Sequence, residues 1–120
     1  MAPQKRSLDA LIADLRKWAA SGQVSVSDLS PEMLDQAQVV MNAGTWCIVC
    51  VGESAGQILR LYPDFADEGL AQQLTLANAA RNRLVHGYYD LDSEQIWKTL
   101  NHSFTTLIDA LDACERAKSE

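Results

Sequence analysis

The sequence predicts an all-α protein, an up-and-down bundle of four helices in one domain that spans residues 1–120. Apolar residues recur three and four positions apart along most of the chain, which is the spacing of one face of an α-helix. The chain contains only three prolines and six glycines, so few residues interrupt long helices. A chain of 120 residues is long enough to bury one hydrophobic core but not two.

The first helix is expected to begin after Ser7, a residue type that caps free backbone N–H groups. Its apolar face consists of Leu8, Leu11, Ile12, Leu15 and Trp18. Gly22 is expected to end this helix, because glycine readily adopts the left-handed conformation that follows many helices. Residues 23–29 mix serine, valine and aspartate without a helical period, so we interpret them as a loop.

The second helix is predicted to begin at Ser30-Pro31-Glu32, which supplies a cap, a proline at the first helical position and an acid near the positive end of the dipole. Pro63 ends it, because proline disfavours helical geometry in the residue before it. One apolar seam follows its whole length: Leu34, Ala37, Met41, Gly44, Ile48, Val51, Ala55, Ile58 and Tyr62. Trp46, Val49 and Cys50 make the opposite face apolar as well. A helix with two apolar faces must be covered on both, and a second subunit is the expected cover.

The third helix is expected to begin near Asp67 or Glu68 and to end at Gly87. Its inward stripe includes Arg81, which is unusual because an arginine is rarely buried without a partner. The last helix is predicted to begin behind Asp92, with Gln95 completing a capping box. Its seam consists of Trp97, Leu100, Phe104, Leu107, Leu111 and Cys114.

Charge and composition narrow the class of protein. No apolar run approaches the roughly 20 residues of a membrane span, and no apolar stretch follows the basic residues of the N-terminus as in an export signal. Three cysteines are an odd number and do not indicate a disulfide framework, so we expect a cytoplasmic protein. The pair Cys47 and Cys50 has no second pair of ligands beside it, so we interpret it as packing rather than a metal site. The formal net charge of −6 indicates that any nucleic acid is held locally.

Candidate catalytic residues are concentrated between Arg81 and Asp92. A guanidinium holds a phosphate in a fixed two-pronged geometry, and an imidazole moves protons near neutral pH. On an unbroken helix Arg81 and His86 lie about 140° apart around the axis. They converge either because the helix ends between them or across a two-fold axis, where two subunits share a groove. The alternative is structural: Arg81 pairs with Glu53 or an aspartate, and His86 caps its own helix.

Three further polar residues leave two interpretations each. Glu53 is either an exposed acid at the edge of the apolar patch or the partner of an arginine or a backbone amide near the cleft. Arg83 is either an additional phosphate contact or a solvated surface residue. His102 is expected to face solvent or to cap a helix.

The segment Arg81-Asn82-Arg83-Leu84-Val85-His86-Gly87-Tyr88, followed by Leu91-Asp92 and by Ile96-Trp97 at the start of a helix, resembles the HEPN superfamily of helical nucleic-acid enzymes. More narrowly it resembles the HepT-like toxin branch, whose signature is R-x4-H-x-Y. The segment 51–55 is similar to that branch's Ile-Gly-Glu-Ala element. The helix order fits over nearly the whole chain. One departure is the helical stretch Glu68 to Ala80, where the branch usually has a short segment with a tryptophan.

The resemblance implies the toxin of a toxin–antitoxin pair, a metal-independent endoribonuclease that works as a homodimer without a cofactor. Arg81 and His86 match the catalytic pair, and Asn82 matches a polar residue common after the arginine, with Glu53 and Arg83 as supporting residues. Tyr88 matches the tyrosine to which a cognate nucleotidyltransferase antitoxin attaches AMP. The implied substrate is RNA, with tRNA as one candidate. The alternative is a non-catalytic HEPN-like module that binds a nucleotide or mediates dimerisation.

The implied chemistry is consistent with these residue types. RNA carries its own nucleophile, the 2′-hydroxyl, so the enzyme needs only proton transfer and stabilisation of charge on the phosphorane. We assign the proton to His86 and the charge to Arg81, while Asn82 donates a hydrogen bond to phosphate or orients His86. DNA lacks this hydroxyl and is expected to survive. A phosphate ester on Tyr88 would place negative charge where the substrate phosphate must bind.

Overall fold

The structure is a computed structural model that describes residues 5–87 and 92–120. The elements in this part are α1 (Leu8–Ser25), α2 (Pro31–Asp35), α3 (Gln38–Leu61), α4 (Glu68–His86), α5 (Ser93–Lys98), a short π-helix η2 (Thr99–Ser103) and α6 (Phe104–Ser119). Over the described ranges every regular element is a helix, so the predicted all-α class is confirmed. Within these ranges no helix has both the length and the apolar character needed to cross a membrane.

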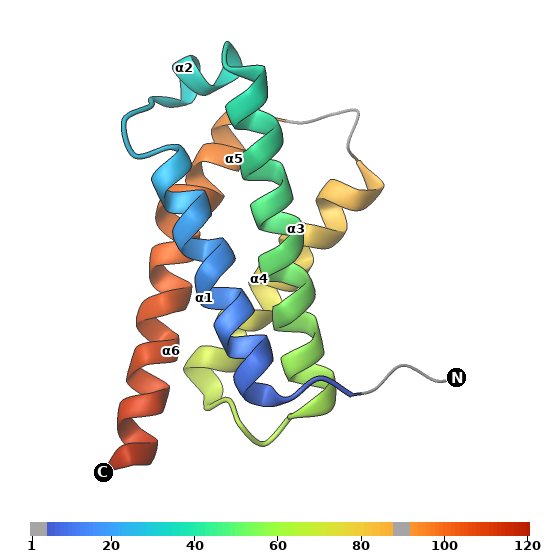
Figure 1. The fold of residues 1–120 in the computed structure, drawn as a ribbon, viewed down its shortest axis with the longest axis vertical. Coiled ribbons are helices and arrows are strands. Elements are labelled where there is room, and N and C mark those ends of the chain that lie inside the picture. The colour runs from blue at the N-terminus through green and yellow to red at the C-terminus, as the bar shows by residue number, and fades with distance from the viewer. Residues whose placement is uncertain (1–4, 88–91) are drawn as a thin grey trace.

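The long helices pack around one hydrophobic core (Figure 1). Helix α3 contacts both α1 and α4, and α6 contacts α4 and α1. The largest fully buried side chains come from all four of these helices and from the segments between them: Leu11, Leu15, Val26, Leu34, Val51, Ile58, Leu70, Leu74, Leu100, Phe104 and Leu111. Most of them lie on the stripes that the three- and four-residue spacing predicts.

The predicted helix starts are confirmed by side-chain caps. The side chains of Ser7, Ser30, Asp67 and Asp92 each accept a hydrogen bond from a backbone N–H in the first turn of the helix that follows. These bonds satisfy donors that have no partner within the helix. Local sequence therefore determines where these four helices begin.

The predicted end of the first helix at Gly22 is wrong. Helix α1 continues to Ser25, and Gly22 is buried inside it. A Cβ atom at this position would lie 2.8 Å from Cδ2 of Leu100 and 2.9 Å from Cε2 of Phe104. The glycine is needed because the last helix approaches closely here. The expected loop of residues 23–29 begins only after Ser25, where α1 ends.

The prediction of a single helix from Pro31 to Tyr62 is also wrong. The chain leaves helical geometry at Ala37, which has φ −111° and ψ 76°, and this separates the short α2 from α3. Leu34 of α2 is fully buried, and α2 packs against α5 at one end of the molecule (Figure 1). The apolar seam runs across the break, and no proline or glycine marks it in the sequence.

The predicted last helix contains a π-helical turn, η2, between α5 and α6. Leu100, in this turn, is fully buried and points between α1 and α3. A Cβ atom on Gly44 would lie 2.6 Å from its Cδ1, so both Gly22 and Gly44 leave room for this one side chain. One turn earlier, Nε1 of Trp97 donates a hydrogen bond of 2.6 Å to the carbonyl oxygen of Leu29. The last helix is thereby fixed to the segment that follows α1.

Candidate active site

Helices α3 and α4 approach each other closely at two glycines. A Cβ atom on Gly52 would overlap Cβ of Arg81 and would lie 2.8 Å from the carbonyl oxygen of Ala77. A Cβ atom on Gly56, one turn further along α3, would lie 2.7 Å from Oδ1 of Asn78. The backbone of α3 is thus the surface on which the arginine of the predicted catalytic pair rests.

Arg81 is held at this seam by two polar neighbours. Its Nη1 donates a hydrogen bond of 3.0 Å to Oδ1 of Asn82, and its Nη2 lies 3.7 Å from Oε2 of Glu53. Its Nε is buried and has no hydrogen-bond partner within the described part of the chain. The side chain remains 30% exposed, so the outer edge of the guanidinium reaches solvent.

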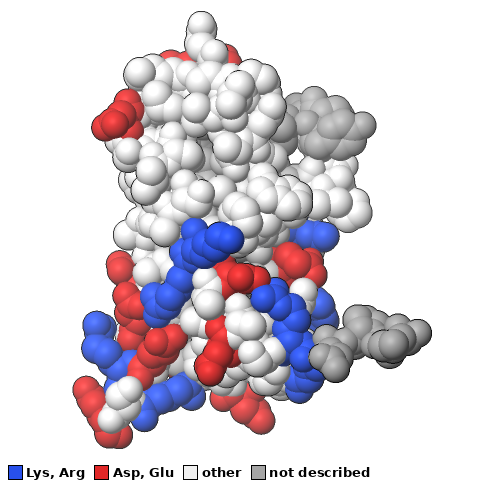
Figure 2. All heavy atoms as spheres, viewed as in Figure 1, with Lys and Arg blue, Asp and Glu red and all other residues white. Residues whose placement is uncertain are grey.

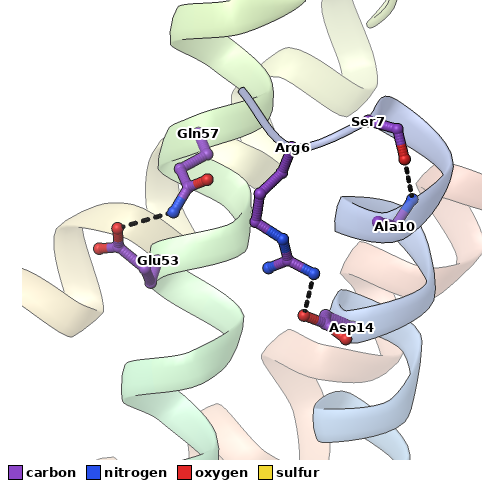
Figure 3. A network of polar contacts seen from close by, with 6 residues as sticks. All are labelled: Arg6, Ser7, Ala10, Asp14, Glu53 and Gln57. Carbon is purple, nitrogen blue, oxygen red and sulfur yellow. Dashed lines mark hydrogen bonds and ion pairs between the residues drawn. The ribbon is translucent and has the colours of Figure 1, made fainter. Parts of the chain in front are cut away.

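Glu53 combines the two interpretations that its sequence context allows. Its side chain is 48% exposed, and it faces Arg81 at 3.7 Å. Gln57, one turn along α3, donates a hydrogen bond of 3.0 Å to the other carboxylate oxygen (Figure 3). An exposed ion pair of this length contributes little to stability, on the order of 0–1 kcal/mol. The carboxylate therefore orients Arg81 without binding it tightly.

His86 is the last residue of α4 and is exposed. The helix does not end between Arg81 and His86, because the N–H of Gly87 still bonds to the carbonyl of Arg83 at 2.8 Å. The two side chains consequently leave the helix about 140° apart. An early helix end therefore does not bring Arg81 and His86 of one chain together. Asn82 lies one turn before His86 on the same face and bonds to Arg81. Asn82 therefore bonds to Arg81 and lies on the side of α4 from which His86 leaves.

Arg83 lies on a different side of α4 from Arg81, about 200° away around the axis. It borders a hollow of about 250 Å³ between α3, α4 and α5. Its neighbours there are Ile48, Ala80, Leu84, Gly87, Asp92, Gln95, Ile96 and Thr99. The structure therefore does not bring Arg83 together with Glu53 and Arg81. Tyr88, the predicted site of modification, lies outside the described residues.

The cysteines and the second histidine lie away from Arg81. Cys47 and Cys114 are buried and Cys50 is half-buried, as expected for packing residues. Burial raises the pKa of the Cys47 thiol, and burial with the neighbouring Cys47 raises that of Cys50, so both stay protonated. No group of three or more metal-binding side chains is found in residues 5–87 and 92–120. His102 is exposed and lies edge-on to the Trp97 ring, with centroids 5.3 Å apart.

Sequence reasoning missed Arg60 and Asn78, which flank the Arg81 seam. The added Cβ on Gly56 would meet Oδ1 of Asn78 at 2.7 Å and Nη1 of Arg60 at 3.4 Å, so both polar side chains lie over this glycine. The signal that could have found them is the spacing of Gly52 and Gly56. Two glycines one turn apart on one side of a helix indicate a close approach of another backbone.

Comparison with protein families supports the resemblance in the sequence. The family model described as Ribonuclease HepT-like matches residues 12–114. No curated protein and no solved structure matches the chain. The matched range runs from the first turns of α1 to the last turns of α6 and includes Glu53, Arg81 and His86. The chain therefore belongs to the HepT-like ribonuclease family.

Proposed function

We propose that this protein is the toxin of a toxin–antitoxin pair, a metal-independent endoribonuclease that acts in the cytoplasm as a two-fold homodimer of HEPN-like four-helix bundles. The observation that carries the proposal is the hydrogen bond between Arg81 and Asn82. This pair reaches the surface one turn before His86, and the chain belongs to a ribonuclease family. The substrate is RNA, and tRNA is one candidate.

The proposed reaction uses the 2′-hydroxyl of the RNA as the nucleophile. The 2′-oxygen attacks the adjacent phosphorus and its proton passes to an imidazole of His86. The bond to the 5′-oxygen breaks as that oxygen takes up a proton from water, which leaves a 2′,3′-cyclic phosphate and a 5′-hydroxyl. Arg81 stabilises the charge on the non-bridging oxygens of the phosphorane, for which a planar guanidinium has the appropriate geometry. Asn82 holds the guanidinium through its Oδ1 and donates its amide N–H groups to phosphate.

The homodimer is supported by an uncovered apolar face on α3. Val39 is 82% exposed and Trp46 is 57% exposed, although both lie on a helix that buries its other side in the core. No lysine or arginine occurs from residue 18 to residue 59. Figure 2 shows the result. In this view, the half of the molecule that contains the end of α1, α2 and the start of α3 displays no basic side chain. A second copy that covers this face also offers a route for Arg81 and His86 of different protomers to meet.

Trp46→Glu is expected to convert the dimer into a monomer, because it places a charge at the centre of the apolar face. The side chain is more than half exposed in a single copy, so the helical spectrum of the monomer should not change. Leu76→Glu is the matched control, since Leu76 is 56% exposed but lies on α4. Sedimentation velocity gives the mass of both variants. A Trp46→Glu protein that still sediments as a dimer would remove this face from the interface.

Regulation is assigned to Tyr88, at the matching position of the R-x4-H-x-Y signature. A partner nucleotidyltransferase would transfer AMP from ATP to the phenolic oxygen, with release of pyrophosphate. The phosphodiester so formed carries negative charge two residues from His86 in the sequence. It repels the substrate phosphate from the site and silences the toxin.

The proposal is tested by incubating the purified dimer with cellular RNA in the presence of a metal chelator. We expect cleavage of RNA to fragments, no cleavage of DNA of the same sequence, and loss of cleavage after treatment with the nucleotidyltransferase and ATP. A protein that forms the dimer but leaves all RNA intact would instead be the non-catalytic HEPN-like module. Cleavage that persists after Tyr88 is adenylylated would overturn the regulatory assignment alone.

A further inference from the structure

We infer that Arg60 is a second phosphate-binding residue, and that the RNA backbone lies along the seam between α3 and α4 from Arg60 to Arg81. This inference rests on the proposed function and adds a positioning residue that lies outside the R-x4-H signature.

Gly52 and Gly56 fix the positions of the two arginines relative to each other. The stem of Arg81 crosses α3 at Gly52, and Nη1 of Arg60 lies over Gly56 beside Oδ1 of Asn78. The two glycines are one helical turn apart, which is about 6 Å along the axis of α3. The stem of Arg81 and the guanidinium of Arg60 therefore lie on the same side of α3, along its seam with α4.

The polar groups on this line favour a polyanion. Arg60 is exposed, and within the described ranges it forms no ion pair with a carboxylate. Arg81 has one carboxylate partner there, Glu53, at a distance of 3.7 Å. The side chains placed on this line thus include two guanidiniums and one half-exposed carboxylate, in a chain whose formal net charge is −6. A local excess of positive charge is the arrangement that an acidic protein needs to hold a nucleic acid.

The neighbouring basic residue does not share this arrangement. Arg6 extends toward α1 and forms an ion pair with Asp14 at 2.6 Å, while Gln57 bonds to Glu53 on α3 (Figure 3). Arg6 is therefore neutralised by its own partner. Arg60 is the basic residue of α3 that remains beside the seam.

The guanidinium of Arg81 has hydrogen-bond donors that are available to a phosphate. Its Nε is buried without a partner, and its contact with Glu53 is long. An unsatisfied buried donor is unfavourable. A phosphate oxygen that replaced the Glu53 carboxylate would form shorter, two-pronged bonds with the guanidinium. Arg60 and the amide of Asn78 would then hold the next phosphate of the strand.

The test compares Arg60→Gln with Arg116→Gln in the 120-residue chain. Both arginines lie in the last turn of a helix, α3 and α6 respectively, so each substitution removes the same favourable interaction with the helix dipole. The probe is a labelled single-stranded RNA of mixed sequence with every 2′-hydroxyl methylated, so that it binds but is not cleaved. Fluorescence anisotropy gives Kd over a series of salt concentrations.

Arg60→Gln should weaken binding about five-fold at about 0.1 M monovalent salt and reduce the slope of log K against log salt by about 0.7, the effect of one single-strand phosphate contact. On cleavable RNA it should raise KM and leave kcat unchanged, and Arg116→Gln should match the wild type in every measurement. If Arg81→Gln reduces the slope while Arg60→Gln does not, the inference about Arg60 is wrong and the proposed function stands. If the wild-type protein does not bind the RNA, both are wrong.

Discussion

Replacing His86 with alanine is expected to lower kcat/KM for RNA cleavage by about 10²- to 10⁴-fold, the usual contribution of a positioned general acid or base. Melting temperature and helical spectrum should stay within error of the wild type. The reason is that His86 is exposed at the last position of α4, and its imidazole forms no hydrogen bond or ion pair with the described residues. Surface substitutions of this kind change stability by roughly 0.5 kcal/mol or less.

His102→Ala provides the control for this experiment, because the chain contains only two histidines and both are exposed. His102 lies in η2 against the edge of Trp97, on a different element from Arg81. We expect this variant to cleave RNA at the wild-type rate. Equal activity of the His86→Ala and wild-type proteins would remove His86 from the mechanism.

Gly52→Ala is expected to destabilise the protein by about 2 kcal/mol and to impair cleavage. The added methyl group would overlap Cβ of Arg81 and would lie 2.8 Å from the carbonyl oxygen of Ala77, which is backbone and cannot rotate away. Helices α3 and α4 must therefore move apart, and Arg81 moves with α4. The higher helix propensity of alanine, about 1 kcal/mol, offsets part of the cost of the overlap. Thermal unfolding should show a melting temperature lower by roughly 8 °C.

Gly69→Ala is the matched control for the glycine at the seam. Gly69 lies in the first turn of α4, and the nearest atom to an added Cβ is Oδ1 of Asp67 at 3.6 Å, an ordinary contact. This substitution should raise the free energy of unfolding by up to about 1 kcal/mol, because alanine favours the helix and the site has room. A Gly52→Ala protein that melts as high as Gly69→Ala would show that α3 and α4 do not meet as closely as described.

Much of the fold was predictable because local side chains determine where the helices begin. Ser7, Ser30, Asp67 and Asp92 each form the cap that their residue type and position indicate. Inward-facing residues also follow from spacing, since a three- and four-residue repeat places side chains on one face of a helix whatever packs against it.

The errors arose where distant contacts overrule local signals. Gly22 has the residue type of a helix end, but it lies inside α1 because Leu100 and Phe104 need its space. The break at Ala37 has no proline or glycine beside it, although Leu34 just before it is fully buried. The apolar residues of the last helix keep their three- and four-residue spacing through the π-helical turn around Leu100, so the spacing does not reveal the turn. No sequence window of one helix contains the residues that cause these three features.

The candidate site shows the same division. Arg81, Asn82 and His86 were identifiable from one short motif because they lie on consecutive turns of one helix. Arg60 and Asn78 were not, because their proximity depends on two helices that cross at Gly56. The side on which Arg83 lies could have been read from helical geometry, because residues two positions apart point to nearly opposite sides.

The crossing of α3 and α4 has one more consequence. The Cβ atom of Arg81 packs against the backbone of α3 at Gly52, whereas His86 lies at the C-terminal end of α4. The base of the Arg81 side chain is thus held against the scaffold, whereas the exposed imidazole of His86 forms no hydrogen bond or ion pair with the described residues. Under the proposed function, a held arginine and an adjustable imidazole would let one short signature fit RNA strands of different local shape.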